Sequence, residues 1–91
     1  MRKIEEQMKH AAFNDQNWKS GNTQVKYEGF ITRVYLWGNL IAEVCNGIAH
    51  PVVDTLIEHP TVTTVSRLRA LGVNVRQFNQ DVYLDGQMIA A

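Results

Sequence analysis

The most regular pattern of apolar and polar residues in the chain occurs twice. Residues 34–42 (Val-Tyr-Leu-Trp-Gly-Asn-Leu-Ile-Ala) return at 82–90 as Val-Tyr-Leu-Asp-Gly-Gln-Met-Ile-Ala, with six of nine positions identical. Each copy is an apolar run, a two-residue break with Gly and a second apolar run. This pattern predicts a β-hairpin, because a two-residue primed turn needs positive φ, which Gly adopts without steric cost. The residues that flank the two copies do not match, which favours two hairpins built from similar strand-forming residues over an old duplication.

The first part of the chain predicts a helix over residues 2–16, because Ile4, Met8, Ala11 and Ala12 fall on one stripe. The stripe is narrow, so this helix is expected to lie on a sheet rather than build a core alone. A polar connector follows over 14–22 and contains Trp18. We expect Trp18 to pack back on the sheet, with an exposed contact residue as the alternative, since Trp is enriched at interface hot spots.

The middle of the chain predicts three strands, at 23–27, 30–37 and 40–45, with turns at Glu28-Gly29 and Gly38-Asn39. A two-residue loop pairs Tyr35 with Ala42 and Val34 with Glu43. One face of this hairpin then holds Thr32, Val34, Leu36, Ile41, Glu43 and Cys45. The other face holds Ile31, Arg33, Tyr35, Trp37, Leu40, Ala42 and Val44.

The remainder predicts an edge strand or irregular crossing over 48–57, where Pro51 argues against a central strand. A helix is expected over 61–71, with Thr61 as its cap and Gly72 after its end. Its apolar face is Val62, Val65, Leu68 and Leu71. Arg67 is expected to point to solvent. A strand over 73–78 and a hairpin around Asp85-Gly86 complete the chain.

The predicted fold is therefore α+β. An antiparallel sheet of about five strands, built from hairpins, is flanked by the N-terminal helix and the short second helix. The 91 residues correspond to one domain, 1–91.

Composition limits the class of function. Nine basic residues balance nine acidic ones, which argues against unaided binding to a nucleic-acid duplex. The single cysteine, Cys45, suits a reducing compartment and is expected to be a small buried residue of a strand. Neither a secretory signal nor a membrane-length apolar run is visible, so we expect a cytosolic protein.

Candidates for catalysis or metal binding are weak. His10, His50 and His59 lack the spacing of a zinc site. Asp54 and Glu58 would lie one helical turn apart in a helix, but such a pair is more often simply solvated. We therefore expect neither a cofactor nor a bound metal, and no enzymatic activity.

Basic and aromatic residues give better candidates for a binding site. Three basic residues come from the second helix and the strand after it: Arg67, Arg69 and Arg76. Three more come from the first connector and sheet: Lys19, Lys26 and Arg33. Trp18, Tyr35 and Trp37 are aromatic candidates. Arg33 and Tyr35 are expected on one face with Trp37, an arrangement that can stack a base or hold a phosphate. In the alternative, these residues form a solvated face in which the arginines pair with Glu28, Glu43 or Asp81.

Four segments together resemble a family of short proteins encoded by tailed bacteriophages: residues 1–8 (MRKIEEQM), 17–25 (NWKSGNTQV), 34–42 (VYLWGNLIA) and 63–68 (TTVSRL). Among such proteins the chain is most similar to anti-CRISPR proteins that act on the type I-F crRNA-guided surveillance complex. The resemblance implies a non-enzymatic inhibitor that binds the backbone of this complex near the guide RNA and blocks hybridisation of target DNA. The implied partners are Cas proteins, with local crRNA contact and neither a membrane nor a small-molecule substrate. The implied location is the cytoplasm of the infected bacterial host.

Two other functions remain open at this point. The chain could be a phage early protein that binds another host target, such as the transcription machinery or a nuclease. It could also be a small nucleic-acid-binding module, which the zero net charge disfavours.

Overall fold

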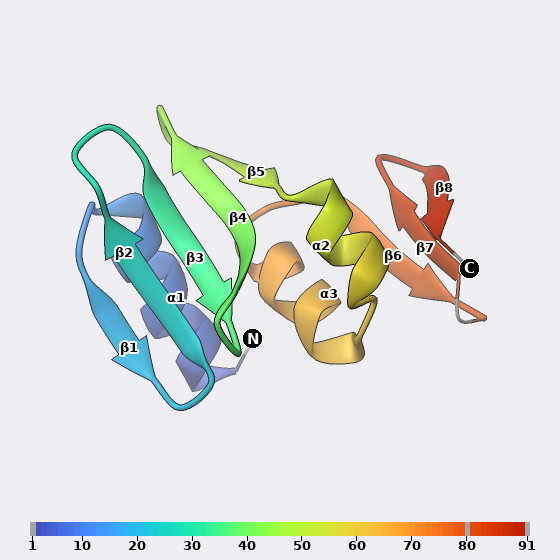
Figure 1. Cartoon of the computed structure of the whole chain (residues 1–91), viewed down its shortest axis with the longest axis horizontal. Helices are drawn as coiled ribbons and strands as arrows, with labels where there is room; N and C mark the ends of the chain where they lie inside the picture. Colours follow the sequence, from blue (N-terminus) through green and yellow to red (C-terminus); the bar gives the residue numbers. More distant parts are fainter. Residues whose placement is uncertain (1, 80, 91) are drawn as a thin grey trace.

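The computed structural model describes residues 2–79 and 81–90, which form three helices and two antiparallel sheets (Figure 1). Sheet A has the strand order β1-β2-β3-β4-β5, and sheet B has the order β6-β7-β8. The elements are α1 (Lys3–Phe13), β1 (Trp18–Ser20), β2 (Thr23–Tyr27), β3 (Thr32–Leu36), β4 (Asn39–Cys45), β5 (Ile48–Pro51), α2 (Val53–Glu58), α3 (Val62–Ala70), β6 (Val75–Phe78), β7 (Asp81–Leu84) and β8 (Gln87–Ala90). The predicted α+β class is confirmed, and the C-terminal strands form a separate small sheet.

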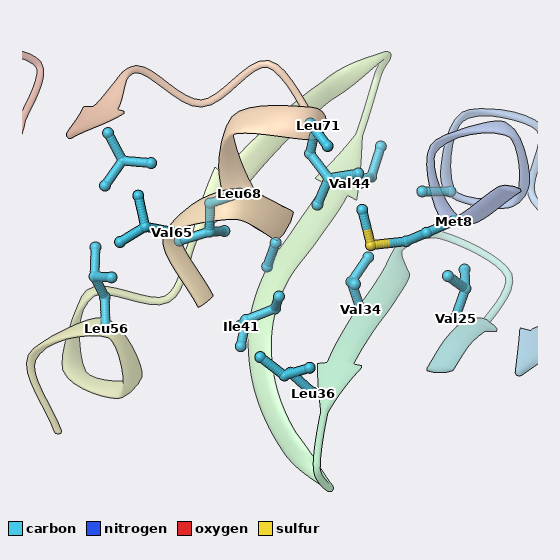
Figure 2. Close-up of a cluster of buried hydrophobic side chains, with 14 of the residues drawn as sticks. Met8, Val25, Val34, Leu36, Ile41, Val44, Leu56, Val65, Leu68 and Leu71 are labelled. Atoms are coloured by element: carbon cyan, nitrogen blue, oxygen red, sulfur yellow. The ribbon is translucent and has the colours of Figure 1, made fainter. Parts of the chain in front are cut away.

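The core lies between one face of sheet A and the helices. Helix α1 covers that face over β1, β2 and β3, while α3 packs against β4, β6 and α1. Figure 2 shows Met8 reaching from α1 toward Val34, and Leu71, which directly follows α3, beside Val44 of β4. Burial of such side chains is the main force that holds α1 and α3 on the sheet.

Helix α1 ends three residues earlier than predicted, at Phe13. The Asn14 side chain donates to the carbonyl of His10 (2.7 Å), which satisfies one of the free carbonyls of the last turn. Asp15 then adopts a φ of 54°, a left-handed conformation that cannot continue the helix.

Two elements were missed or misplaced by the sequence prediction. The connector that holds Trp18 contains a strand, β1, which pairs antiparallel with β2 and places Trp18 opposite Val25. The stretch predicted as an edge strand or crossing does contain the edge strand β5, but it continues into the short helix α2. Leu56 of α2 is buried in the core, which explains why so short a helix forms there.

The register of the β3–β4 hairpin differs from the prediction by two residues next to the turn and by one residue beyond a β-bulge. Trp37 and Gly38 are the turn residues, both with positive φ, and a β-bulge follows, so that Val34 pairs with Ala42 while Tyr35 pairs with Leu40. The predicted pairing of Tyr35 with Ala42 is therefore wrong. The bulge inserts one extra residue into β4, and a one-residue shift moves side chains to the opposite face.

This shift exchanges residues between the two predicted faces. Ala42 and Val44 lie on the buried face, opposite Val34 and Thr32 respectively. Glu43 lies on the other face, opposite Arg33.

The C-terminal helix follows its prediction closely. Helix α3 begins after Thr61, whose hydroxyl accepts a hydrogen bond from the Thr64 amide (3.1 Å), and Gly72 follows its end with a φ of 92°. Val65 and Leu68 are buried as expected. The predicted solvent-facing position of Arg67 is wrong, because this side chain is buried.

The repeated phrase forms the same structure twice. In the β7–β8 hairpin, Asp85 and Gly86 take positive φ, and the register shifts between Val82 and Tyr83, as it does between Val34 and Tyr35 in the first copy. Both hairpins pair with a preceding strand in the same register, since Leu36 lies opposite Thr23 and Leu84 lies opposite Val75. In both hairpins, the amide of the first turn residue also donates a hydrogen bond to the residue before the preceding strand. The Trp37 amide donates to the Asn22 carbonyl and the Asp85 amide to the Asn74 carbonyl, each at 2.8 Å. The structural repeat therefore extends beyond the repeated sequence.

In both places a helix packs on the strand that precedes the repeated residues: α1 on β2, and α3 on β6. We call α1, β2, β3 and β4 the N-terminal unit, and α3, β6, β7 and β8 the C-terminal unit.

Candidate binding surfaces

Four of the predicted site residues lie together on the face of sheet A that α1 does not cover. Lys26 on β2 lies directly opposite Arg33 on β3. Gln24 on β2 lies between Lys19, its partner on β1, and Tyr35, its partner on β3. We call this surface, made by Lys19, Lys26, Arg33 and Tyr35, the sheet A outer face. Antiparallel pairing brings these residues together, because directly opposite side chains point to the same face of a sheet.

Charges on this face are partly balanced. Arg33 forms ion pairs with Glu28 and with Glu43 (3.1 Å to Glu43) at about one-third exposure of its side chain. The hydrogen bond to Glu43, together with the charge of Glu28, raises the pKa of Arg33. The predicted alternative, pairing of Arg33 with these two acids, is confirmed. The Lys26 ammonium lies 5.6 Å from the centre of the Tyr35 ring, within the range of a cation–π contact.

The two tryptophans lie away from this face. Trp18 is half-buried and packs against the core, which confirms its expected role as an anchor. Trp37 occupies the turn between β3 and β4 and is 60% exposed. The prediction that Trp37 shares a strand face with Arg33 and Tyr35 is wrong, since the turn begins one residue earlier than expected.

Arg67 is part of a buried polar cluster that joins α1, α3 and β2. Its guanidinium donates to the Glu5 carboxylate (2.8 Å) and to the Thr23 hydroxyl (3.2 Å), and Ser66 also donates to Glu5. Burial alone raises the pKa of Glu5, but the hydrogen bonds from Ser66 and Arg67 outweigh it and lower the pKa below its ordinary value. With 3% exposure, Arg67 fixes the two helices to the sheet rather than facing a partner.

Arg69 and Arg76 are exposed, and neither takes part in an ion pair among the described residues. They lie on different sides of sheet B. Arg69 is on α3, which packs on the side of Gln77, whereas Arg76 is on the opposite side, because successive residues of β6 alternate. The six basic candidates therefore fall into separate places instead of a single patch.

Exposed apolar side chains form a second candidate surface that the sequence prediction missed. Phe78 and Met88 are 66% and 56% exposed, on the side of sheet B away from α3. Tyr83, opposite both Arg76 and Met88, lies between them. The predicted two-residue turn at Asp85-Gly86 already implies that Met88 lies opposite Tyr83, so this part of the surface could have been found from the sequence.

The described part of the chain also bears on metal binding and on membrane insertion. Three or more His, Cys, Asp or Glu side chains do not gather anywhere within residues 2–79 and 81–90 in a way that could hold a metal ion. Among the helices that the structure describes, none has the length and apolarity needed to cross a membrane.

The fold and its surfaces define a small α+β protein with two antiparallel sheets, each with one open face. The chain matches the family model described as "Kyanoviridae Gp96 protein" over residues 1–90, so it belongs to this family of tailed-phage proteins. Searches of curated proteins and of solved structures found no match.

Proposed function

We propose that this phage protein acts by binding, without catalysis, and that its target is the type I-F crRNA-guided surveillance complex. In this proposal it is an anti-CRISPR inhibitor that sits on Cas proteins near the guide RNA in the cytoplasm of the infected host and prevents target DNA from hybridising. Support comes from the phage family and from the resemblance in four sequence segments.

The observation that carries the proposal is the gathering of Lys19, Lys26, Arg33 and Tyr35 on the sheet A outer face. Lysines can contact phosphates of a guide RNA, and the Tyr35 ring can stack on a base. Because Arg33 is already paired with two acids, its role is to balance the negative charges of Glu28 and Glu43, which would otherwise repel such phosphates.

Protein contacts would supply the rest of the affinity. A standard interface buries about 800 Å² on each partner, and the folded chain exposes 5522 Å². Balanced charge suits a protein that binds mainly to protein and touches RNA locally.

The test is a gel shift in which assembled type I-F complex, preincubated with the protein, is offered labelled target DNA. We expect stoichiometric protein to abolish DNA capture. The double variant Lys19→Glu/Lys26→Glu should need about tenfold more protein, since like charges would then face the RNA phosphates. Lys3→Glu/Lys9→Glu, with the same charge change at exposed positions of α1, is the matched control and should inhibit normally.

Unchanged DNA capture at a large excess of the wild-type protein would refute the type I-F target. Normal inhibition by the Lys19→Glu/Lys26→Glu variant would refute the assignment of the sheet A outer face.

A second candidate is binding to another host protein, favoured by the exposed Phe78 and Met88 on sheet B. A pull-down from host lysate separates the two, because it returns Cas proteins with guide RNA in one case and a different protein in the other.

A further inference from the structure

The two units differ at one edge. In the N-terminal unit, the outer edge of β2 is covered by β1, with Trp18 opposite Val25 and Ser20 opposite Thr23. In the C-terminal unit the equivalent strand is β6, and within the described residues it pairs only with β7. Within the described residues, no strand therefore takes beside β6 the place that β1 takes beside β2.

The free edge of β6 carries backbone groups aimed outward. Hydrogen-bonded and non-hydrogen-bonded positions alternate along an antiparallel pair. The Asp85 amide bonds the Asn74 carbonyl on the β7 side, so the backbone groups of Gln77, three positions further on, point to the open edge. Val25, which corresponds to Gln77 in the N-terminal unit, uses this edge to pair with β1.

A groove of about 610 Å³ lies beside this edge, between α3 and β6. Val62, Ser66 and Arg69 line it from α3, at positions that share one stripe of the helix, and Gln77 lines it from β6. Val62 is 68% exposed, so an apolar side chain in the groove would find a partner there. In Figure 1, β6 lies between β7 on one side and the helices α2 and α3 on the other.

The charged side chains on the two sides of β6 near this edge are positive: Arg69 lies on the side of the groove, and Arg76 on the opposite side. The acidic residue that lines the groove, Glu5, is already bound by Arg67 and Ser66. Arg69 lies at the groove and Arg76 is exposed on the strand itself, and neither has an acidic partner among the described residues.

From this comparison we infer that β6 accepts an added antiparallel strand from a partner protein, an extended acidic segment that occupies the place β1 takes in the N-terminal unit. Addition of a strand to a free sheet edge is a general mode of peptide recognition, in which backbone hydrogen bonds give affinity and alternate side chains give specificity. The partner residue opposite Gln77 is apolar and faces Val62, and the residue opposite Arg76 is acidic. This surface is separate from the sheet A outer face, so the inference holds whatever the target proposed above.

A second copy of the chain fits this edge poorly. Twofold pairing of β6 with itself around Arg76 would set two arginines opposite each other, and like charges in directly opposite positions are destabilising.

The test uses the full ¹⁵N-labelled chain and two amidated octapeptides, one of alternating Val and Asp and one of alternating Val and Lys. We expect the Val-Asp peptide to shift amide signals of β6 and α3 saturably. The Val-Lys peptide should bind at least about tenfold more weakly. Methylation of those backbone nitrogens of the Val-Asp peptide that face β6 should abolish binding, because these nitrogens could then no longer donate hydrogen bonds to β6.

Charge reversal gives the matched variants. Arg76→Glu should weaken Val-Asp binding about tenfold and strengthen Val-Lys binding, while Lys9→Glu on α1 should change neither. The inference is overturned if no saturable binding occurs up to about 1 mM, if the shifts lie on sheet A, or if the two peptides bind equally. It is also overturned if β6 signals shift with protein concentration alone, which would show that a second copy occupies the edge.

Discussion

The N-terminal and C-terminal units have the same strand pairing, bulge and turn geometry, but different surroundings. In the N-terminal unit the position opposite Leu36 is Thr23, whose hydroxyl accepts a hydrogen bond from the buried Arg67. In the C-terminal unit the position opposite Leu84 is Val75, which is buried among apolar side chains. The polar cluster therefore joins the N-terminal unit, at Thr23, to α3 of the C-terminal unit, whereas the equivalent position Val75 is held by apolar packing.

This difference shows how one local structure serves two roles. The N-terminal unit sits in the middle of sheet A, with β1 and β5 on its two sides and α1 over one face. The C-terminal unit keeps both of its edge strands, β6 and β8, without a further partner in the described chain. Repeated hairpin geometry specifies the unit, whereas the elements around it decide which parts stay open for binding.

The largest expected effect follows from breaking the polar cluster that joins α1 and β2 of the N-terminal unit to α3 of the C-terminal unit. Arg67→Met would leave the Glu5 carboxylate buried without its charge partner, and loss of one member of a buried pair costs about 3–5 kcal/mol. Urea denaturation should show this loss. Arg69→Met, two residues away and exposed, is the matched control and should cost less than about 0.5 kcal/mol. Equal effects of the two substitutions would contradict the role of the buried pair.

The pH dependence of stability checks the same cluster. Because the folded pKa of Glu5 is lowered, its contribution is complete above the unfolded pKa of about 4.3 and is lost as the pH falls through the lower folded value. The wild-type free energy of unfolding should therefore decrease between about pH 5 and pH 3. In Arg67→Met, burial of Glu5 without the arginine raises its pKa, so the difference between variant and wild type should shrink as the pH falls.

A smaller effect compares equivalent leucines in the two units. Leu36 is 1% exposed, and Leu36→Ala should cost about 2–5 kcal/mol through lost burial and a cavity. Leu84 is only half-buried, so Leu84→Ala should cost less than about 2 kcal/mol. Chemical denaturation measures both losses of unfolding free energy, and we expect the dependence on denaturant concentration to stay the same as in the wild type. A larger loss at Leu84 would mean that sheet B is covered more fully than sheet A at this position.

The sequence was sufficient for elements with strong local patterns. Thr61 and Gly72 marked both ends of α3, and Asp85-Gly86 marked the C-terminal turn. It was insufficient where tertiary contacts decide. The strand β1 forms because Trp18 packs on the core beside β2, and α2 forms because Leu56 is buried, although neither segment has a periodic pattern of its own.

The candidate site shows the same limit. Spacing placed Arg67 on the outer side of α3, but its buried acceptors, Glu5 and Thr23, come from distant parts of the chain. The pairing of Lys26 with Arg33 was not predicted either, because a two-residue turn at Glu28-Gly29 would place Lys26 opposite Ile31, whereas residues 28–31 join the two strands.

The smallest expected effect concerns the turns of the two repeated hairpins, where residues with different tolerance of positive φ occupy the same position. Trp37 and Asp85 occupy the same turn position, with φ of 51° and 52°. Asp tolerates positive φ and suits a type I′ turn before Gly, whereas a bulky aromatic residue is strained there. Trp37→Asp should therefore stabilise the protein by about 0.5–1 kcal/mol, and Asp85→Trp should destabilise it by a similar amount, as measured by thermal and urea denaturation. Because Trp37 is 60% exposed, little burial is lost in the exchange. Destabilisation by Trp37→Asp would mean that the indole contributes packing which outweighs the relief of backbone strain, and the two turns would then no longer be equivalent.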